Sequence, residues 1–316
     1  KLGEVMETQS VDNLLRHPKT DYTRDLLRSV PSQMPRIARD EQSDQIVLAT
    51  GDLCKTYGGT GLFTNSREVK AVQDVSISLM KGRTLGIVGE SGSGKSTVAR
   101  CIMRLIDPTS GNIMVGGKDI ARLSQKELKP QRKNIQIVFQ DPMRSLNPRI
   151  EVGQSIIEGP LNYGVPRADA IKRARELLEL VGLPASAVDR FPHQFSGGQR
   201  QRIAIARALA MDPDVLVADE AVSALDVSVQ AQVLDLLAEL QERLGLGILF
   251  ITHDLGVAAQ ICDEVMVMQY GRMVEYGPAA QVLGSPQQNY TKALITAAPG
   301  RHWDFANFRP FAEAAE

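Results

Sequence analysis

The sequence predicts an α/β protein with a mostly parallel sheet, and three observations point to this fold class. A glycine-rich stretch at 89–97 lies between an apolar run at 85–88 and a helical pattern at 98–105. A second apolar run, at 215–219, leads into two consecutive acidic residues. From residue 215 onward, strand-like and helix-like segments alternate, which is typical of parallel strands joined by helical crossovers. We expect strands at 215–219, 247–252 and 264–269, and helices at 227–244 and 254–262.

The other elements follow from hydrophobic periodicity. Residues 46–88 alternate as strands do, most clearly from Val69 to Leu79, and we expect an antiparallel β subdomain there. Residues 112–120 read as strand and turn, and 135–139 as a short apolar strand. Helical periodicity with charged outer positions runs from Ala168 to Val181 and predicts a helical subdomain at about 141–204.

The glycine-rich stretch is the strongest functional signal. Gly89, Gly94, Lys95 and Ser96 fit G-x-x-x-x-G-K-[ST], and a strand, a loop and a helix follow in the order that this motif requires. Backbone N–H groups and the helix N-terminus would hold phosphate oxygens, Lys95 would reach the β- and γ-phosphates, and Ser96 would ligate Mg²⁺. A flexible turn is the alternative, but the strand and helix favour the P-loop NTPase core. The predicted loop comprises Gly89, Glu90, Ser91, Gly92, Ser93, Gly94, Lys95, Ser96 and Thr97.

Two carboxylates at a strand end form the second signal. In Val215-Leu216-Val217-Ala218-Asp219-Glu220 the apolar strand ends beside the expected phosphate loop. Asp219 would hold Mg²⁺, and Glu220 would polarise an attacking water as general base. Acidic residues also favour the first turn of a helix, which is the alternative. The matched phosphate loop favours the catalytic interpretation.

A second anion-binding helix start is predicted at Phe195-Ser196-Gly197-Gly198-Gln199. Ser196 is a good N-cap, and the two glycines expose backbone N–H groups. This site and the phosphate loop need not bind the same nucleotide.

Composition excludes several classes of protein. The formal net charge of −1 over 316 residues gives no basic field for nucleic acid. Cys54, Cys101 and Cys262 lie far apart, so they indicate neither a zinc site nor a disulfide framework. No apolar run reaches the roughly 18 residues that span a bilayer, and no signal peptide is evident. We expect a soluble protein of a reducing compartment, and if it serves a membrane process it must dock on a separate membrane partner.

An internal repeat indicates a tandem organisation. Residues 3–31 align without gaps to 271–299, and a linker-like polar segment follows at 32–45. We expect that 1–31 is the tail of an upstream domain, that 46–270 is a second domain and that 271–316 is its C-terminal extension. The identities pair Gly3, Glu7, Leu15, Pro18, Tyr22, Thr23, Leu26 and Pro31 with Gly271, Glu275, Leu283, Pro286, Tyr290, Thr291, Leu294 and Pro299.

Residues 46–270 resemble the nucleotide-binding domains of ABC transporters, because the motifs of that family occur in its order. Besides the phosphate loop and the Asp219–Glu220 pair, the matches are Tyr57 for the adenine-stacking aromatic, Gln140 for the glutamine that contacts Mg²⁺ and water, Ser196, Gly197, Gly198 and Gln199 for the signature, Asp226 for the interface loop, and His253 for the switch histidine. Phe195 replaces the usual leucine of the signature, and Ala221 replaces a common proline.

The resemblance implies a mechanism in which two domains pack head to tail around two ATP molecules. The signature of one domain would complete the phosphate site of the other. ATP and Mg²⁺ are the implied cofactors, with Ser96, Gln140 and Asp219 as metal contacts and Glu220, His253 and Gln140 as catalytic residues.

Two further segments resemble importers of dipeptides, oligopeptides, nickel and glutathione. They are Gln140-Asp-Pro-Met-Arg-Ser-Leu-Asn-Pro-Arg149 and the Pro-x-x-x-Tyr-Thr tail after residue 270. This implies a peripheral protein at the cytoplasmic face of the inner membrane, with two permease subunits, a periplasmic solute-binding protein and a second nucleotide-binding domain as partners. No cysteine follows Cys262, so we expect no iron–sulfur tail.

Two alternatives remain open at this point. A soluble ABC ATPase acting on nucleic acid or ribosomes is disfavoured, since only 98–195 separate the phosphate loop from the signature and no coiled coil or zinc module fits there. A non-catalytic regulatory domain is disfavoured by the presence of Glu220 and His253.

Overall fold

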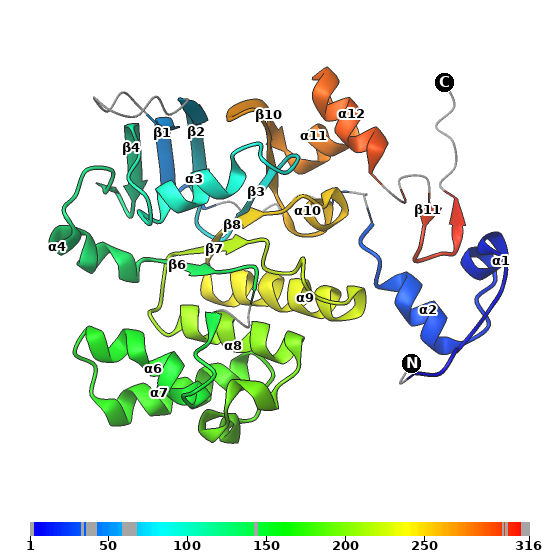
Figure 1. The fold of residues 1–316 in the computed structure, drawn as a ribbon, viewed down its shortest axis with the longest axis horizontal. Helices are drawn as coiled ribbons and strands as arrows, with labels where there is room; N and C mark the ends of the chain where they lie inside the picture. The colour runs from blue at the N-terminus through cyan, green and yellow to red at the C-terminus, as the bar shows by residue number, and fades with distance from the viewer. Residues whose placement is uncertain are drawn as a thin grey trace.

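The fold is built on a six-stranded sheet with its strands in the order β10-β9-β3-β8-β7-β6. The computed structural model describes residues 3–32, 35, 43–58, 68–141, 145–298, 300 and 303–310 (Figure 1). All neighbouring pairs in this sheet are parallel except β9 and β10, which run antiparallel at one edge. The strands are β3 (Thr84–Val88), β6 (Ile135–Val138), β7 (Val215–Asp219), β8 (Gly247–Ile251), β9 (Glu264–Gln269) and β10 (Arg272–Pro278).

Burial explains why these short runs form parallel strands. Every residue of β3 and β8 is buried, as expected for strands that are covered on both faces. One face packs on a core that includes Leu85, Val98 and Ile102, and the other packs on a core that includes Phe250 and Leu237. Their carboxyl ends therefore lie at one edge, where loops can bring functional groups together.

A second, antiparallel sheet has the strand order β2-β1-β4-β5 and packs over α3. Its strands are β1 (Ile46–Tyr57), β2 (Val69–Met80), β4 (Ser110–Val115) and β5 (Lys118–Asp119). The register between β1 and β2 brings Tyr57 opposite Val69. This confirms the predicted antiparallel β sheet alongside the mostly parallel one.

Helices cover the parallel sheet and extend beyond one end of it (Figure 1). The central ones are α3 (Lys95–Ile102), α9 (Val227–Leu244) and α10 (Leu255–Ile261), with α4 (Gln125–Leu128) and η1 (Lys129–Lys133) beside the antiparallel sheet. A separate group of helices forms the region where the helical subdomain was expected. Its members are α6 (Val152–Asn162), α7 (Arg167–Leu180), η2 (Ala185–Asp189), η3 (Pro192–Gln194) and α8 (Gly197–Leu209).

Both ends of the chain form small helical extensions. After β10 come α11 (Ala279–Gly284), α12 (Asn289–Ala297) and a hairpin of β11 (Trp303–Asp304) and β12 (Arg309–Pro310). The N-terminal segment contains α1 (Val11–Arg16) and α2 (Asp21–Arg28), and it lies near β11 at one side of the molecule (Figure 1). Most of the predicted linker at 32–45 lies outside the described residues.

Several predicted boundaries were wrong. The strand expected at 247–252 ends at Ile251, and the helix expected at 254–262 spans Leu255–Ile261. Two further differences have a local reason. The helix after the glycine loop spans 95–102 rather than 98–105, because Arg104 adopts φ 49° and ends it. The strand expected at 135–139 ends at Val138, and Phe139 is partly exposed beyond the sheet.

Candidate active site

The phosphate loop connects β3 to α3, and its backbone geometry requires glycine at two positions. Gly89 has φ 147° and Gly94 has φ 107°, conformations that residues with a Cβ rarely adopt. A Cβ would also lie 2.3 Å from Met268 O at Gly89 and 2.4 Å from Ala71 O at Gly94. The loop is therefore held against neighbouring backbone, and the first turn of α3 begins directly at Lys95.

A cavity of about 380 Å³ opens over this loop. It combines the start of α3 with the edge of the antiparallel sheet and with the β9–β10 turn. The residues that line it are Val69, Lys70, Ala71, Ser91, Gly92, Gly94, Lys95, Ser96, Thr97, Glu220, Tyr270 and Gly271. The helix N-terminus and two lysines make this cavity suited to an anion.

Lys95 turns its ammonium group back onto its own loop. Its Nζ donates hydrogen bonds to Gly89 O at 2.7 Å and to Glu90 O at 2.8 Å. Burial lowers the pKa of Lys95, while the nearby carboxylates Glu220 and Asp219 oppose that shift. A phosphate placed in the cavity would give this buried cation an anionic partner.

Ser96 and Asp219 meet from different elements. Ser96 lies at the second position of α3, Asp219 ends β7, and Ser96 Oγ donates to Asp219 Oδ1 at 3.2 Å. Burial raises the pKa of Asp219, and the Ser96 hydrogen bond opposes this. A hydroxyl and a carboxylate in contact supply the hard oxygen ligands that Mg²⁺ prefers, so these residues fit the predicted metal contact.

Glu220 is the centre of a second polar cluster. Gln140 Nε2 donates to Glu220 Oε2 at 2.9 Å, and His253 Nδ1 lies 3.4 Å from Glu220 Oε1. Glu220 itself adopts φ 50°, and its N–H donates to Ile251 O at 2.9 Å. A non-glycine residue held in this conformation stores backbone strain, which is typical of functional positions. The carboxylate borders the cavity, where it can accept a proton from a water molecule.

The residues predicted as a second anion-binding helix start lie at the N-terminus of α8. Gln199 N donates to Ser196 Oγ, and Ser196 N donates to Gln199 Oε1, which completes a capping box. Gly198 packs closely, since a Cβ there would lie 2.2 Å from Val229 Cγ1. Ser196, Gly197 and Gln199 are exposed, and none of them lines the cavity over the phosphate loop.

Two predicted binding residues lie at the edges of the site. Tyr57 ends β1, is 40 % exposed and stands opposite Val69, which lines the cavity. Lys55 Nζ lies 5.1 Å from the centre of the Tyr57 ring. Asp226 is the exposed N-cap residue of α9, and its side chain makes no capping hydrogen bond there.

The chain also resembles known proteins in sequence and structure. Residues 72–223 match the family model described as "ABC transporter", and residues 6–58 and 274–309 match "Oligopeptide/dipeptide transporter, C-terminal region". A Brucella ovis protein provisionally named as a peptide import ATP-binding protein is 50 % identical over 254 residues, which cover 80 % of this chain and 78 % of that protein. The chain belongs to the ABC transporter ATP-binding family. It is an ATPase cassette with the C-terminal region of the peptide-transporter branch.

Other relatives of this ABC cassette differ in length. The glutathione import ATP-binding protein GsiA of Salmonella typhi is 44 % identical over 324 residues, covering 94 % of this chain but 52 % of that protein. CbiO1 from Clostridium perfringens, part of an ABC transporter complex, superposes with a TM-score of 0.67 at 31 % identity, covering 77 % of this chain and 92 % of that one. The dimeric ATP-binding cassette MJ0796, bound to ADP and Pi in a post-hydrolysis state, superposes with a TM-score of 0.65 at 29 % identity. The match covers 73 % of this chain and 98 % of that one.

The structure adds residues to the cassette's site that the sequence motifs missed. Tyr270 and Gly271 form the β9–β10 turn and line the cavity, and Tyr270 has φ 49°. Gly271 N donates to Ser93 O at 2.9 Å, which ties this turn to the phosphate loop. The Tyr-Gly pair between two strand-like runs is a turn signal that could have placed it at a strand end.

The C-terminal extension also reaches the phosphate loop. Tyr290, on α12, accepts a hydrogen bond of 3.4 Å from the Glu90 backbone N–H through its hydroxyl. Burial raises the pKa of Tyr290. Tyr290 belongs to the repeat found in the sequence, but repetition alone does not reveal what a side chain contacts.

The described residues contain no cluster of three or more histidine, cysteine or acidic residues arranged to hold a metal ion. Among the helices in the described part of the chain, none combines the length and apolar character needed to cross a bilayer.

Proposed function

We propose that this ABC cassette hydrolyses ATP to power an importer of the peptide class, for di- or oligopeptides or a related small solute such as glutathione or nickel. The observation that carries the proposal is the convergence of Gln140 and His253 on Glu220 at the rim of the phosphate-loop cavity. The match to the oligopeptide/dipeptide transporter region, together with the names of the relatives, supports the cargo class.

In this proposal each polar group of the cavity has a separate task. Backbone N–H groups of 89–97 and Lys95 hold the phosphates, Tyr57 stacks on adenine, and Glu220 takes the proton of the attacking water. Ser96, Asp219 and Gln140 would hold Mg²⁺, which when bound would neutralise phosphate charge. Gln140 and His253 orient Glu220 and the water.

A second nucleotide-binding domain completes the site. Ser196, Gly197 and Gln199 are exposed at a helix start and do not line this chain's own cavity, so their anion-binding end is available to another copy. Asp226, exposed at the start of α9, would lie in the same contact. The dimeric assembly of a related cassette supports this arrangement.

The membrane partners follow from the importer class. We propose that two permease subunits hold the cassette at the cytoplasmic face of the inner membrane, and that a periplasmic solute-binding protein delivers the cargo. The helical region near 141–165 would pass closure of the cassettes to the permeases. Arg207 of α8 donates from Nη1 to Ser145 O and so joins α8 to this region.

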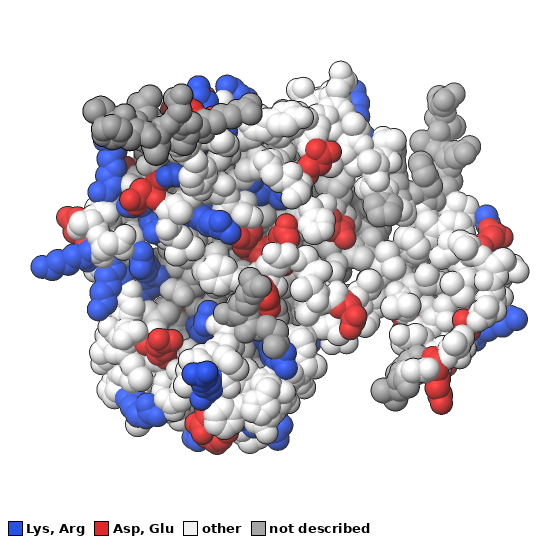
Figure 2. Space-filling view, viewed as in Figure 1, with Lys and Arg blue, Asp and Glu red and all other residues white. Residues whose placement is uncertain are grey.

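The rival function, an ABC ATPase acting on nucleic acid, draws little support from the face shown in Figure 2. Basic side chains gather around α4 and η1, where Lys126, Lys129, Arg132 and Lys133 lie, and acidic side chains are interspersed elsewhere on the same face (Figure 2). A nucleic-acid footprint is usually a continuous basic stripe.

Co-purification and transport-coupled turnover test the proposal. The gene product should co-purify with two permeases, and ATPase in liposomes should rise several-fold with a binding protein loaded with dipeptide, glutathione or nickel. Lys95→Ala, which removes the phosphate contact, should abolish the response. ATPase stimulated by RNA in a salt-sensitive manner, with no permease retained, would favour the rival function instead.

A further inference from the structure

The sequence repeat is also a structural repeat, in matching register. The two six-residue helices α1 and α11 begin at Val11 and Ala279, an offset of 268 residues. The α2 and α12 helices begin at Asp21 and Asn289, the same offset. Even the helix ends agree, since His17 N donates to Asn13 O and Ser285 N donates to Gln281 O. The helices of residues 11–28 therefore repeat those of the C-terminal extension.

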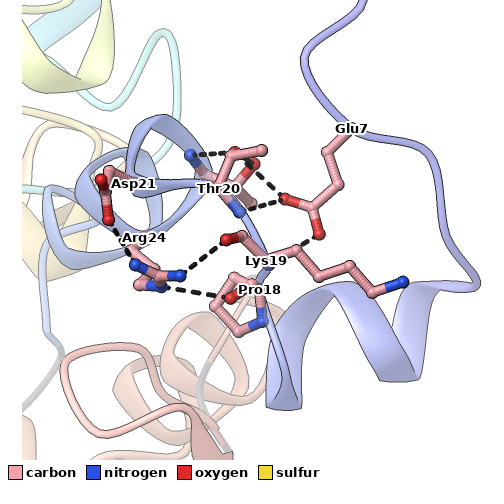
Figure 3. A network of polar contacts seen from close by, with 7 residues as sticks. Glu7, Pro18, Lys19, Thr20, Asp21 and Arg24 are labelled. Atoms are coloured by element: carbon pink, nitrogen blue, oxygen red, sulfur yellow. Dashed lines mark hydrogen bonds and ion pairs between the residues drawn. The ribbon is translucent and has the colours of Figure 1, made fainter.

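A carboxylate organises both copies in the same way. Glu7 accepts hydrogen bonds from the backbone N–H groups of Lys19 at 2.8 Å and Thr20 at 3.2 Å (Figure 3). Glu275 accepts from Gln287 N at 2.8 Å and Gln288 N at 3.2 Å. A hydrogen bond from the Thr23 side chain and those from the backbone lower the pKa of Glu7 to about 2. The N-terminal copy is thus a formed structure rather than a chance likeness of two helices.

The two copies differ in what covers their apolar face. Ala279 and Val282 of α11 are 2 % and 1 % exposed and belong to the core of this cassette. Their counterparts are Val11, which is 75 % exposed, and Leu14, which is only half-buried. The C-terminal copy therefore buries this apolar face, whereas the N-terminal copy leaves it exposed.

The same contrast holds on the second helix. Tyr290 and Leu294 of α12 are half-buried and pack against the core, while Tyr22 and Leu26 of α2 are each 39 % exposed. We call Val11, Leu14, Tyr22 and Leu26 the open face.

The extended segment before α1 shows the same difference. Residues 272–278 form β10, which pairs with β9 of this cassette. The equivalent residues 4–10 are assigned to neither helix nor strand. In the C-terminal copy the cassette thus supplies a partner strand, a covering core and, at Glu90, a contact for the tyrosine hydroxyl.

Contacts that are absent from the repeat attach residues 3–32 to this cassette. The Arg16 guanidinium lies 5.3 Å from the Trp303 ring centre, and that of Arg28 lies 5.3 Å from Phe308. The equivalents of these arginines are Gly284 and Thr296, so the repeat cannot make the same contacts. The segment is held through side chains that lie outside the open face.

We propose that the open face of residues 3–32 is the docking surface for a second nucleotide-binding cassette, encoded upstream on the same polypeptide. The edge strand of that cassette pairs with residues 4–10, its core covers Val11 and Leu14, and its phosphate loop receives Tyr22. Residues 3–32 thereby join the two cassettes. This chain covers only 52 % of the related protein GsiA, and the rest of GsiA is long enough for a second cassette of this kind.

Hydrogen exchange followed by mass spectrometry tests this on the intact gene product and on the 316-residue chain. Amides of 4–10 should exchange at least about 100-fold more slowly in the intact product, while 272–278 are protected in both proteins. Val11→Asp should remove the added protection. Asn13→Asp is the matched control, because its counterpart Gln281 is exposed.

Three outcomes would overturn the proposal. The first is that the amides of 4–10 exchange equally fast in both proteins. The second is that the intact gene product has no upstream cassette. The third is that protection of the 4–10 amides in the 316-residue chain increases with the concentration of that chain. The last would assign the face to a second copy of this chain. The readout needs no ATPase activity, so its failure would leave the proposed function standing.

Discussion

Gln140 Nε2 donates a 2.9 Å hydrogen bond to Glu220 Oε2, although the two residues lie 80 positions apart in the chain. The bond joins the end of β6 to the end of β7 at the rim of the phosphate-loop cavity. It fixes one carboxylate oxygen of Glu220, while His253 lies near the other. The pair therefore positions the proposed base before nucleotide binds.

Removal of this amide should slow turnover more than binding. We expect Gln140→Ala to lower kcat by about 10- to 100-fold, the order of general-base positioning effects, with ATP affinity within about threefold. Steady-state ATPase and a nucleotide-binding titration separate the two quantities. Gln136→Ala is the control, since the Gln136 amide donates to Arg132 O away from the cavity. Loss of affinity with kcat unchanged would contradict the positioning role.

The carboxylate of Asp219 should lower the stability of the nucleotide-free protein at neutral pH, and this effect should depend on pH. Burial raises its pKa above the ordinary 3.8, so its contribution to folding is most favourable below that value and is lost as pH rises through the folded-state pKa. At pH 7 the buried charge is a cost. Asp219→Asn should therefore raise the Tm of the nucleotide-free protein at pH 7, with a gain that shrinks toward pH 4, and thermal scans across pH measure this.

A second variant makes the Asp219 test sharper. Ser96→Ala removes the hydrogen bond that opposes the raised pKa, so it should lower Tm at pH 7. A lower Tm for Asp219→Asn at pH 7 would show that the carboxylate is stabilising.

The contact between the C-terminal extension and the phosphate loop should affect nucleotide binding. Tyr290→Phe removes the hydroxyl that accepts from Glu90 N, and a net hydrogen bond of about 0.5–1.5 kcal/mol predicts a KM for ATP raised about 2- to 10-fold, with kcat little changed. Tyr276→Phe is the matched control, because that hydroxyl donates to Glu264 Oε2 at 3.0 Å, within the β9–β10 pair. Equal effects of both changes would argue against a role in the loop.

The start of α8 should tolerate a methyl group at one glycine and not at the next. A Cβ at Gly198 would lie 2.2 Å from Val229 Cγ1, whereas one at Gly197 would meet only Leu225 Cδ2 at 3.7 Å. Overpacking against a stiff β-branched side chain costs about 1–3 kcal/mol, so Gly198→Ala should lower Tm by several degrees. Gly197→Ala should change it little. Thermal unfolding measures the Tm of both variants, and equal changes in Tm would contradict the close packing at Gly198.

Much of this architecture could be predicted, because the local hydrophobic patterns agree with the burial that each element has in the fold. The strands at 215–219 and 264–269 and the helix at 227–244 have the predicted bounds, since each is an apolar pattern bounded by polar or turn residues. Asp219 and Glu220, placed at a strand end, and Ser96, placed at the start of the helix after the phosphate loop, do meet at one edge of the sheet. Parallel topology brings such ends together whatever lies between them.

Other features depend on contacts that the sequence does not encode locally. Tyr270 and the strand start at Val69 line the cavity because two sheets meet there. The turn at Tyr270 and the strand from Val69 can each be recognised in the sequence, but not their meeting at the phosphate loop. The helix after the phosphate loop starts at Lys95, three residues before the apolar pattern of 98–105 begins. The glycine loop leads directly into its first turn, with Gly94 as the N-cap residue. The repeat predicted a second extension, but only the structure shows which of its side chains are left uncovered.

Glu220→Gln gives the most direct measurement of the central claim, that this carboxylate takes the proton of the water that attacks ATP. The change keeps the size of the side chain and one oxygen that can accept from Gln140 Nε2, but it removes the base. We expect ATP turnover with Mg²⁺ to fall by at least about 100-fold, with ATP affinity retained and the ATP-bound dimer accumulating. Turnover within twofold of the unaltered protein would contradict the account.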